Sequence, residues 1–394
     1  MTRRLFGTLC GLVFCANFGR VAFAPLLETF RTTFHVGTGA IGLVTTLVWV
    51  GTAVPRIPVG YLVTRVRRGR IVLGAGALLT LASALTATTT SLPLLQAGAF
   101  AIGVASGAYY AAAVPLIGDL YPEGVGRAVG IHGTAAQMAA VIAPTLTVAL
   151  IAAASWRAVF WSLAALGAIL TGVLLLVARR REGGVPQGTD RDFVAALSHW
   201  RIILAAVVMI GGAGFVWQGV FNFYVTYLVA TKGLTAGRAG TLLTVAFAAG
   251  LPAFWVGGSL ADHLPHVPYI LTLGAAVAGG VAALTVADST LAIAAVSIAL
   301  GLAAHSLFPA LDAYVLGAVP DNRGSAYAVY GGLALLVQAT GSGVVGALGE
   351  RYPFDTVFLA FAGGLIALVS LLALLYLAGI VPTADSGYVS SVTE

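Results

Sequence analysis

The sequence predicts an all-α polytopic membrane protein, with twelve transmembrane helices in two pseudo-symmetric six-helix bundles. Only 9% of the 394 residues are charged and 59% are hydrophobic, whereas a soluble domain carries about 25% charged residues. Apolar windows of about 20 residues, long enough to span a bilayer, recur along the chain. The two halves also match each other at one constant spacing. Together these observations exclude a water-soluble enzyme, and they make the net charge of +6 a poor argument for nucleic-acid binding.

The apolar windows predict twelve spans, most of them joined by short connections. Six lie in the first half of the chain, at 5–27, 39–63, 71–90, 93–117, 127–151 and 158–178. The other six lie at 202–228, 239–260, 268–287, 290–315, 325–348 and 356–380. We therefore expect an N-terminal bundle over 1–178, a cytoplasmic linker over 179–201, a C-terminal bundle over 202–380 and a disordered cytoplasmic tail over 381–394.

Basic residues flank the spans unequally, and this bias predicts the orientation of the chain. With the N-terminus inside, thirteen basic residues lie on the cytoplasmic side and five lie outside. Because cytoplasmic loops are enriched in Lys and Arg, we expect a multi-pass protein of the cell (inner or plasma) membrane with both termini cytoplasmic. The two remaining basic residues, Arg20 and Arg56, lie within spans.

A constant offset of 198 residues relates the two halves of the chain at three separate places. It aligns Gly60 with Gly258, Gly103 with Gly301 and Pro122 with Pro320. One ungapped offset that serves distant regions indicates an internal duplication. Duplicated six-helix halves are the architecture of secondary transporters, whose substrate site lies near the membrane midplane at the interface of the repeats.

Two predicted loops carry a more specific signal. Residues 60–68, Gly-Tyr-Leu-Val-Thr-Arg-Val-Arg-Arg, resemble the loop between helices 2 and 3 of the major facilitator superfamily, and residues 258–263, Gly-Ser-Leu-Ala-Asp-His, resemble its counterpart between helices 8 and 9. In such loops a glycine permits close helix approach, and charges latch the cytoplasmic ends of neighbouring helices. The resemblance implies gating roles for Gly60, Arg65, Arg68, Gly258 and Asp262.

Charged side chains inside the spans are the first candidates for substrate binding, since each costs at least about 2.5 kcal/mol on insertion scales. Arg20 lies in the first span, and Asn17 is three residues earlier on the same helical face. Two explanations of Arg20 stay open. Its side chain snorkels or pairs with a carbonyl, or it contacts an anion in the transport cavity.

A further resemblance concerns the second span. The run Arg56-Ile57-Pro58 is similar to the helix-2 arginine motif of the nitrate/nitrite porter branch, and residues 128–133, followed by Gln137, are similar to its helix 5. That branch clamps its anion between two arginines. The offset of 198 residues puts the second one at Phe254, so it is absent from this chain.

Other polar side chains of the spans complete the predicted cavity wall. Beside Arg20, Asn17 and Arg56, the candidates for substrate binding are Tyr110, Gln137, Gln218, Asn222, Tyr330 and Gln338. Each aromatic residue, taken individually, is better explained by packing than by ligand binding. As a group, these side chains suit an organic solute.

His305 and Asp312 share one face of the tenth predicted span and are the candidates for proton coupling. A histidine changes charge near physiological pH, and a carboxylate inside a membrane marks proton relays and ion pathways. The alternative is that Asp312 is a hydrated residue near the helix end and that His305 is a packing residue. Both explanations stay open.

The preferred function is a secondary active transporter that moves a small anionic organic solute across the cell membrane by alternating access. The alternative is a proton-coupled exporter of drugs or other apolar or cationic compounds, and a polytopic membrane enzyme is the third hypothesis.

The sequence shows no nucleophile–base pattern, metal-ligand cluster or phosphate-binding motif. We therefore expect no enzymatic activity, no cofactor and no metal. The expected partners are a small-molecule substrate, the lipid bilayer and a co-transported proton or other ion, with no nucleic acid, and the chain is expected to be a monomer.

Overall fold

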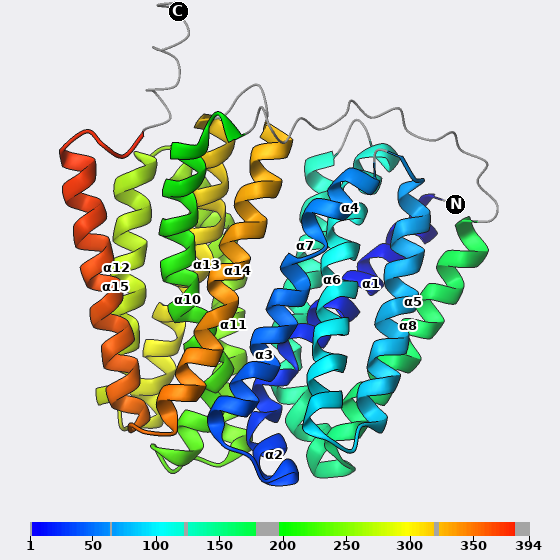
Figure 1. Ribbon diagram of the computed structural model, residues 1–394, viewed down its shortest axis with the longest axis horizontal. Coiled ribbons are helices and arrows are strands. Elements are labelled where there is room, and N and C mark those ends of the chain that lie inside the picture. Colours follow the sequence, from blue (N-terminus) through cyan, green and yellow to red (C-terminus); the bar gives the residue numbers. More distant parts are fainter. Residues whose placement is uncertain (1, 64, 122–124, 179–196, 319–322, 383–394) are drawn as a thin grey trace, which may run out of the picture. The chain divides into compact units, whose positions relative to one another are not determined.

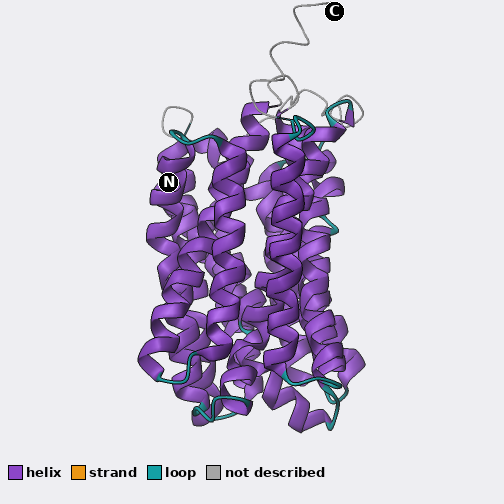
Figure 2. Cartoon of the chain, turned by 90° about the vertical axis from the view of Figure 1, so that its left-hand side faces the viewer, coloured by secondary structure: helices purple, strands orange, loops and turns teal. Residues whose placement is uncertain are grey.

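Helices account for all the regular secondary structure in the part of the chain that the computed structural model describes (Figure 2). The described residues are all except 1, 64, 122–124, 179–196, 319–322 and 383–394. Most of the predicted linker and tail therefore lies outside them, as does the aligned pair Pro122 and Pro320. The chain divides into two compact units, Met1–Asp190 and Arg191–Glu394.

The described residues of the first unit form eight helices, coloured blue to green in Figure 1. They are α1 (Thr2–Val21), α2 (Phe23–Phe34), α3 (Thr38–Ala53), α4 (Arg56–Leu62), α5 (Arg68–Thr88), α6 (Leu92–Leu120), α7 (Val125–Ala153) and α8 (Trp156–Ala178). The second unit contains α10 (Trp200–Ala230), α11 (Ala236–Ala261), α12 (His266–Val286), α13 (Thr290–Ala318), α14 (Arg323–Gly349) and α15 (Phe354–Leu377).

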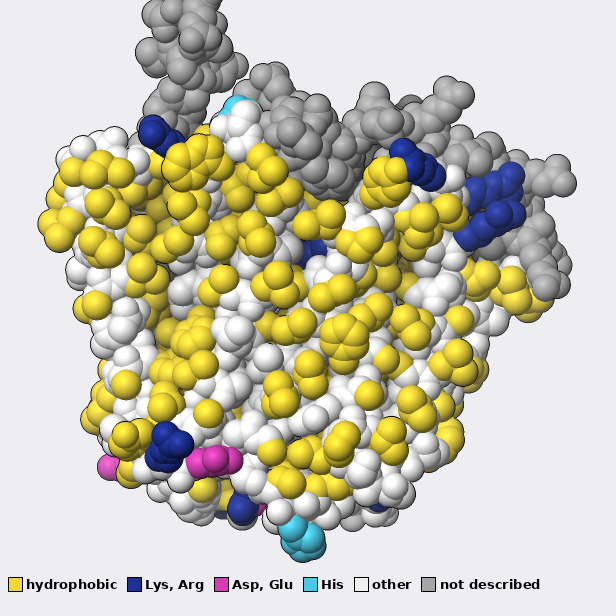
Figure 3. Space-filling model, in the orientation of Figure 1, with side chains coloured by type: hydrophobic (Ala, Val, Ile, Leu, Met, Phe, Trp, Pro, Cys, Tyr) yellow, Lys and Arg dark blue, Asp and Glu magenta, His cyan; other side chains and the backbone are white. Residues whose placement is uncertain are grey.

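The multi-pass architecture predicted from the sequence is confirmed. Eleven of the described helical segments are long and apolar enough to cross a membrane, and the bent pair α1–α2 brings the number to twelve. On the face drawn in Figure 3, hydrophobic side chains cover the middle of each unit, and most charged side chains lie toward its two ends. This distribution matches an apolar bilayer core between two aqueous sides.

Prolines explain the two interrupted spans. The axes of α1 and α2 differ by 43° across Ala22, and Pro25 lacks the N–H group that would bond the carbonyl of Val21 in a continuous helix. The second span breaks between α3 and α4 in the same way, because Pro55 cannot donate to Gly51. These breaks put Arg20 in the last turn of α1 and Arg56 at the first position of α4.

The offset of 198 residues recurs in the helix boundaries. It separates the first residues of α5 and α12 (Arg68 and His266), of α6 and α13 (Leu92 and Thr290) and of α8 and α15 (Trp156 and Phe354). Six helix starts thus recur at this spacing, although the interrupted spans α1–α2 and α3–α4 correspond to the single helices α10 and α11.

The duplication extends to one very close helix contact in each unit. A Cβ atom at Gly103 of α6 would lie 2.1 Å from the carbonyl oxygen of Val48 in α3. A Cβ atom at Gly301 of α13 would lie 2.1 Å from the carbonyl oxygen of Ala246 in α11. Only glycine permits these approaches, which are of the small-residue kind that holds membrane helices together.

Candidate functional site

Arg20 lies at the centre of a buried cluster in the first unit, and only 8% of its surface is exposed. Its Nη2 atom donates hydrogen bonds to Asn17 Oδ1 and, at 3.2 Å, to the hydroxyl of Tyr110 on α6. Asn17 in turn donates from Nδ2 to the backbone carbonyl of Ala136 on α7, at 2.6 Å. The cluster therefore joins α1, α6 and α7 around one guanidinium group.

Two aromatic rings cover the guanidinium group. Its central carbon lies 4.9 Å from the ring centroid of Trp49 on α3 and 4.8 Å from that of Tyr110. Such cation–π contacts stabilise a desolvated cation by up to about 2 kcal/mol each. Trp49 is not among the residues that the sequence predicts for the site, because a tryptophan in an apolar span gives no signal of its own.

The positive charge of Arg20 is not neutralised within the part of the chain that the structure describes. The ion pairs found there are Arg31–Glu28, Arg68–Asp119 and Lys232–Asp288. In addition, Arg20 Nε is buried and has no hydrogen-bond partner among the described residues. The side-chain hydrogen bonds of Arg20 go to a neutral amide and a phenol, and its side chain is buried. Contact with an anion stays a prediction.

Arg56 belongs to the same neighbourhood. Its side chain is half-buried at the start of α4, close enough to Tyr110 for an electrostatic interaction. Gln137, also half-buried, follows Ala136, the residue that Asn17 bonds. Within the first unit, the structure thus brings together Arg20, Asn17, Tyr110 and Arg56.

The predicted polar residues of the second unit are mostly used to join helices. Asn222 of α10 is fully buried, and its Nδ2 donates to Ser342 Oγ on α14 at 2.7 Å and to the backbone carbonyl of Gln218 at 2.8 Å. Gln338 packs against Gly214 so tightly that a Cβ atom there would lie 2.4 Å from its amide carbon. Tyr330 is also buried. Asn222 thus contacts a neighbouring helix, and its place in a cavity wall stays a prediction.

His305 is enclosed by aromatic side chains. Its ring centroid lies 5.4 Å from that of Trp217, 5.9 Å from that of Phe247 and 5.8 Å from that of Phe254. Its Nδ1 atom pairs with the backbone carbonyl of Gly301 at 2.7 Å. Asp312 is half-buried two turns further along α13, about 10 Å away at 1.5 Å per residue. A proton relay between His305 and Asp312 therefore needs intervening water.

An ion pair joins α5 and α6 beside the loop after α4. Arg68, the first residue of α5, pairs with Asp119 of α6 at 2.6 Å and also donates to the carbonyl of Pro115 at 3.1 Å. Arg65 lies over the ring of Tyr61, 3.8 Å from its centroid. The sequence of the second unit does not repeat this pair, because His266 and Gly317 stand 198 residues after Arg68 and Asp119.

The glycines of the two loops differ in packing. Gly60 is buried in α4. A Cβ atom at Gly258 would meet Pro309 at an ordinary 3.6 Å, whereas one at Gly257 would lie 2.7 Å from Ser306 Oγ. The close approach expected at Gly258 is therefore made by its neighbour Gly257. Asp262, at the end of α11, is exposed.

Two duplicated units of membrane-spanning helices, with a buried cation in the first, define a multi-pass membrane transporter. Comparison with known families supports this class of protein. The sequence model of the Major Facilitator Superfamily matches residues 9–294, and the chain belongs to this family. It is a secondary transporter and not an enzyme.

One relative and two solved structures add detail. The chain is 24% identical over 367 residues to the probable sulfoacetate transporter SauU of Cupriavidus necator, covering 87% of this chain and 84% of the relative. Its fold is similar to that of a bacterial homologue of the human lysosomal transporter Spinster. The inward-facing unoccupied crystal structure of that homologue matches with a TM-score of 0.77, at 15% identity and 95% coverage of both chains. The occupied one matches with a TM-score of 0.74, at 16% identity, covering 99% of this chain and 96% of the other.

Proposed function

We propose that this transporter moves a small organic anion across the cell membrane by alternating access, and that Arg20 binds the anionic group. The observation that carries the proposal is a buried guanidinium group with no carboxylate partner among the described residues and with one unpaired N–H group. A charge buried in this way strongly destabilises a protein unless it is compensated. An anionic substrate supplies that compensation each time it binds.

The arrangement around Arg20 also favours a particular anion geometry. Asn17 and Tyr110 both occupy Nη2, whereas Nε has no partner among the described residues. The rings of Trp49 and Tyr110 hold the guanidinium plane in place. A rigid donor set of this kind suits a carboxylate, sulfonate or phosphonate oxygen, because charge-assisted hydrogen bonds to arginine are directional.

The relative suggests the class of solute. SauU is named as a probable sulfoacetate transporter, and sulfoacetate carries a carboxylate and a sulfonate. We propose that short sulfonates and carboxylates are the substrates of this chain and that Arg56 contributes a second positive charge. Nitrate is disfavoured, since the position expected for the second arginine of the nitrate/nitrite porters is Phe254, which is 41% exposed.

A second candidate function, the export of apolar or cationic compounds, is favoured by one observation. Trp217, Phe247, Phe254 and Phe308 surround His305 in the second unit. An aromatic surface of this kind suits a hydrophobic or cationic ligand. The uncompensated charge of Arg20 opposes a cation, which places this function second.

Three further expectations stay proposals. The coupling ion is a proton, handled by His305 and Asp312. Gly60, Arg65, Arg68, Gly258 and Asp262 act in gating. The protein is a monomer. Both of its termini lie in the cytoplasm, as the distribution of basic residues suggests.

The test is ligand binding and uptake by the purified full-length chain. Thermal stabilisation is measured with sulfonates, carboxylates, inorganic anions and organic cations, and the ligands that stabilise are followed by uptake into proteoliposomes. Arg20→Gln should lower anion affinity by about tenfold or more, since a hydrogen bond to a charged group contributes about 1.5–3 kcal/mol. Arg70→Gln removes an exposed arginine and should leave affinity unchanged. Stabilisation by cations alone, or anion uptake unaffected by Arg20→Gln, would contradict the proposal.

A further inference from the structure

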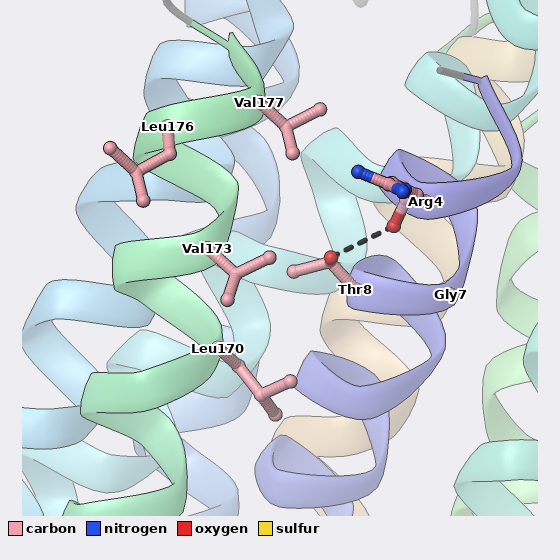
Figure 4. A pocket seen from close by; sticks show the side chains of 7 residues that line it. All are labelled: Arg4, Gly7, Thr8, Leu170, Val173, Leu176 and Val177. Carbon is pink, nitrogen blue, oxygen red and sulfur yellow. Dashed lines mark hydrogen bonds between the residues drawn. The ribbon is translucent and has the colours of Figure 1, made fainter.

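A groove in the first unit opens where α1 and α8 diverge (Figure 4). A Cβ atom at Gly19 would lie 3.0 Å from Leu163, and one at Gly11 would lie 2.9 Å from Leu170, so the two helices pack closely along this stretch. At Gly7, one turn closer to the N-terminus, a Cβ atom would meet nothing within 4 Å. The divergence leaves a cavity of about 700 Å³.

One wall of this groove is apolar. It is made by Leu170, Val173, Leu176 and Val177 of α8, and Figure 4 shows Val173 and Val177 pointing toward α1. Val173 and Leu176 are 39% and 64% exposed. The wall extends about 10 Å along the helix axis at 1.5 Å per residue, and its exposed side chains leave it open to an apolar molecule from outside.

Among the described residues, the opposite wall carries a single charge. Arg4 is the charged residue among those that line the groove, and Thr8 donates its hydroxyl to the Arg4 carbonyl at 2.9 Å. The hydroxyl group of Thr8 is therefore bonded within α1, and its methyl group faces the groove. Arg4 is exposed and forms no ion pair with a described residue. The groove thus combines an apolar wall with one available cation at the helix end.

We propose that this groove binds an anionic phospholipid, with an acyl chain along the α8 wall and the phosphate against Arg4. A phospholipid supplies both an apolar chain and an anionic headgroup, whereas an inorganic anion would not use the wall and a neutral hydrocarbon would not use the arginine. The unequal distribution of basic residues between the two sides predicts that Arg3 and Arg4 lie on the cytoplasmic side. Anionic headgroups there attract basic residues near the membrane surface. This lipid site is independent of Arg20 and of the proposed solute.

The test is native mass spectrometry of the detergent-purified full-length chain, titrated with dioleoyl phosphatidylglycerol or dioleoyl phosphatidylcholine. The wild-type chain should retain phosphatidylglycerol about fivefold better than phosphatidylcholine, as expected for one arginine at an anionic surface. Gly7→Leu places a side chain in the groove, at a position where a Cβ atom meets nothing within 4 Å, and should abolish tight binding of both lipids. Arg4→Gln should keep the binding of both lipids and abolish the preference between them.

Two substitutions serve as matched controls. Gly172 of α8 also has open space around it and does not line the groove, so Gly172→Leu should bind lipid like the wild type. Arg70→Gln removes an exposed arginine elsewhere and should keep the preference for phosphatidylglycerol. A diazirine derivative of phosphatidylglycerol should label peptides from α1 and from the second half of α8.

Several results would overturn the proposal. These are unchanged phosphatidylglycerol binding by Gly7→Leu, equal retention of the two lipids by the wild type, or photolabelling confined to other helices. A dimer of the wild-type chain that Gly7→Leu converts to a monomer would also overturn it, because the groove would then be occupied by a second copy of the chain.

Discussion

Asn17 holds Arg20 through a hydrogen bond from the guanidinium group to a neutral amide oxygen inside the first unit. The Oδ1 atom of Asn17 accepts from Arg20 Nη2, and its Nδ2 atom donates to the carbonyl of Ala136 at 2.6 Å. Asn17 thereby uses both ends of its amide and links α1 to α7. Because an amide orients the guanidinium group without neutralising it, the positive charge stays available to a ligand.

Replacing this amide with a carboxylate tests the role of the charge. Asn17→Asp puts an anion beside Arg20 and supplies the missing counter-charge. We expect anion affinity to fall by about tenfold or more, with little loss of thermal stability, because the new ion pair offsets the lost hydrogen bond to Ala136.

Asn17→Ala is the companion variant. It should lower the free energy of unfolding by about 1–3 kcal/mol and weaken anion binding less than Asn17→Asp does. Retained affinity in Asn17→Asp would show that Arg20 does not bind the anion.

The Arg68–Asp119 pair should affect transport more than stability. Its side chains are 18% and 45% exposed, and exposed ion pairs contribute about 0–1 kcal/mol. We expect Asp119→Asn to change the unfolding free energy by less than about 1 kcal/mol and to change the maximal uptake rate without changing substrate affinity. The exchanged pair Arg68→Asp with Asp119→Arg should recover part of that rate. A large loss of folded protein in Asp119→Asn would instead show that the pair acts mainly in stability.

The two repeat-related glycines should respond alike to alanine. Gly103→Ala and Gly301→Ala each force a methyl group against a backbone carbonyl that lies 2.1 Å from the ideal Cβ position, and such overpacking typically costs about 1–3 kcal/mol. Gly118, also on α6, has nothing within 4 Å of its Cβ position. Gly118→Ala should therefore keep or slightly raise the unfolding temperature, since alanine favours a helix by up to about 1 kcal/mol. Unfolding temperatures in detergent measure all three variants, and equal effects would argue against the tight contacts.

Proton coupling through His305 is tested by separating exchange from accumulation. His305→Phe keeps an aromatic ring beside Trp217 and Phe254 but cannot carry a proton. We expect it to keep substrate counterflow between equal pH values and to lose accumulation driven by a pH gradient. His263→Phe changes an exposed histidine of the loop after α11 and should behave like the wild type. Gradient-driven accumulation that survives in His305→Phe would leave Asp312 as the remaining candidate.

Much of this architecture follows from the chain alone. Span number, the repeat and the choice of Arg20 with Asn17 depend on local composition, on helical spacing and on the cost of a charge in lipid, all of which are visible in a linear sequence. Arg56 is a candidate through a family resemblance and Tyr110 through its place on a predicted span, and both lie near Arg20 in the folded chain. Their roles in binding stay predictions.

Tertiary structure alone decided which side chains contact one another. Tyr110 reaches Arg20 across 90 positions of sequence, and Ser342 reaches Asn222 across 120. Trp49 over Arg20, the aromatic rings around His305 and the tight contact at Gly257 in place of Gly258 likewise depend on the rotation and separation of packed helices. Apolar spans leave these variables undetermined, because nearly every face of such a helix is hydrophobic and no amphipathic pattern marks the side that will be buried.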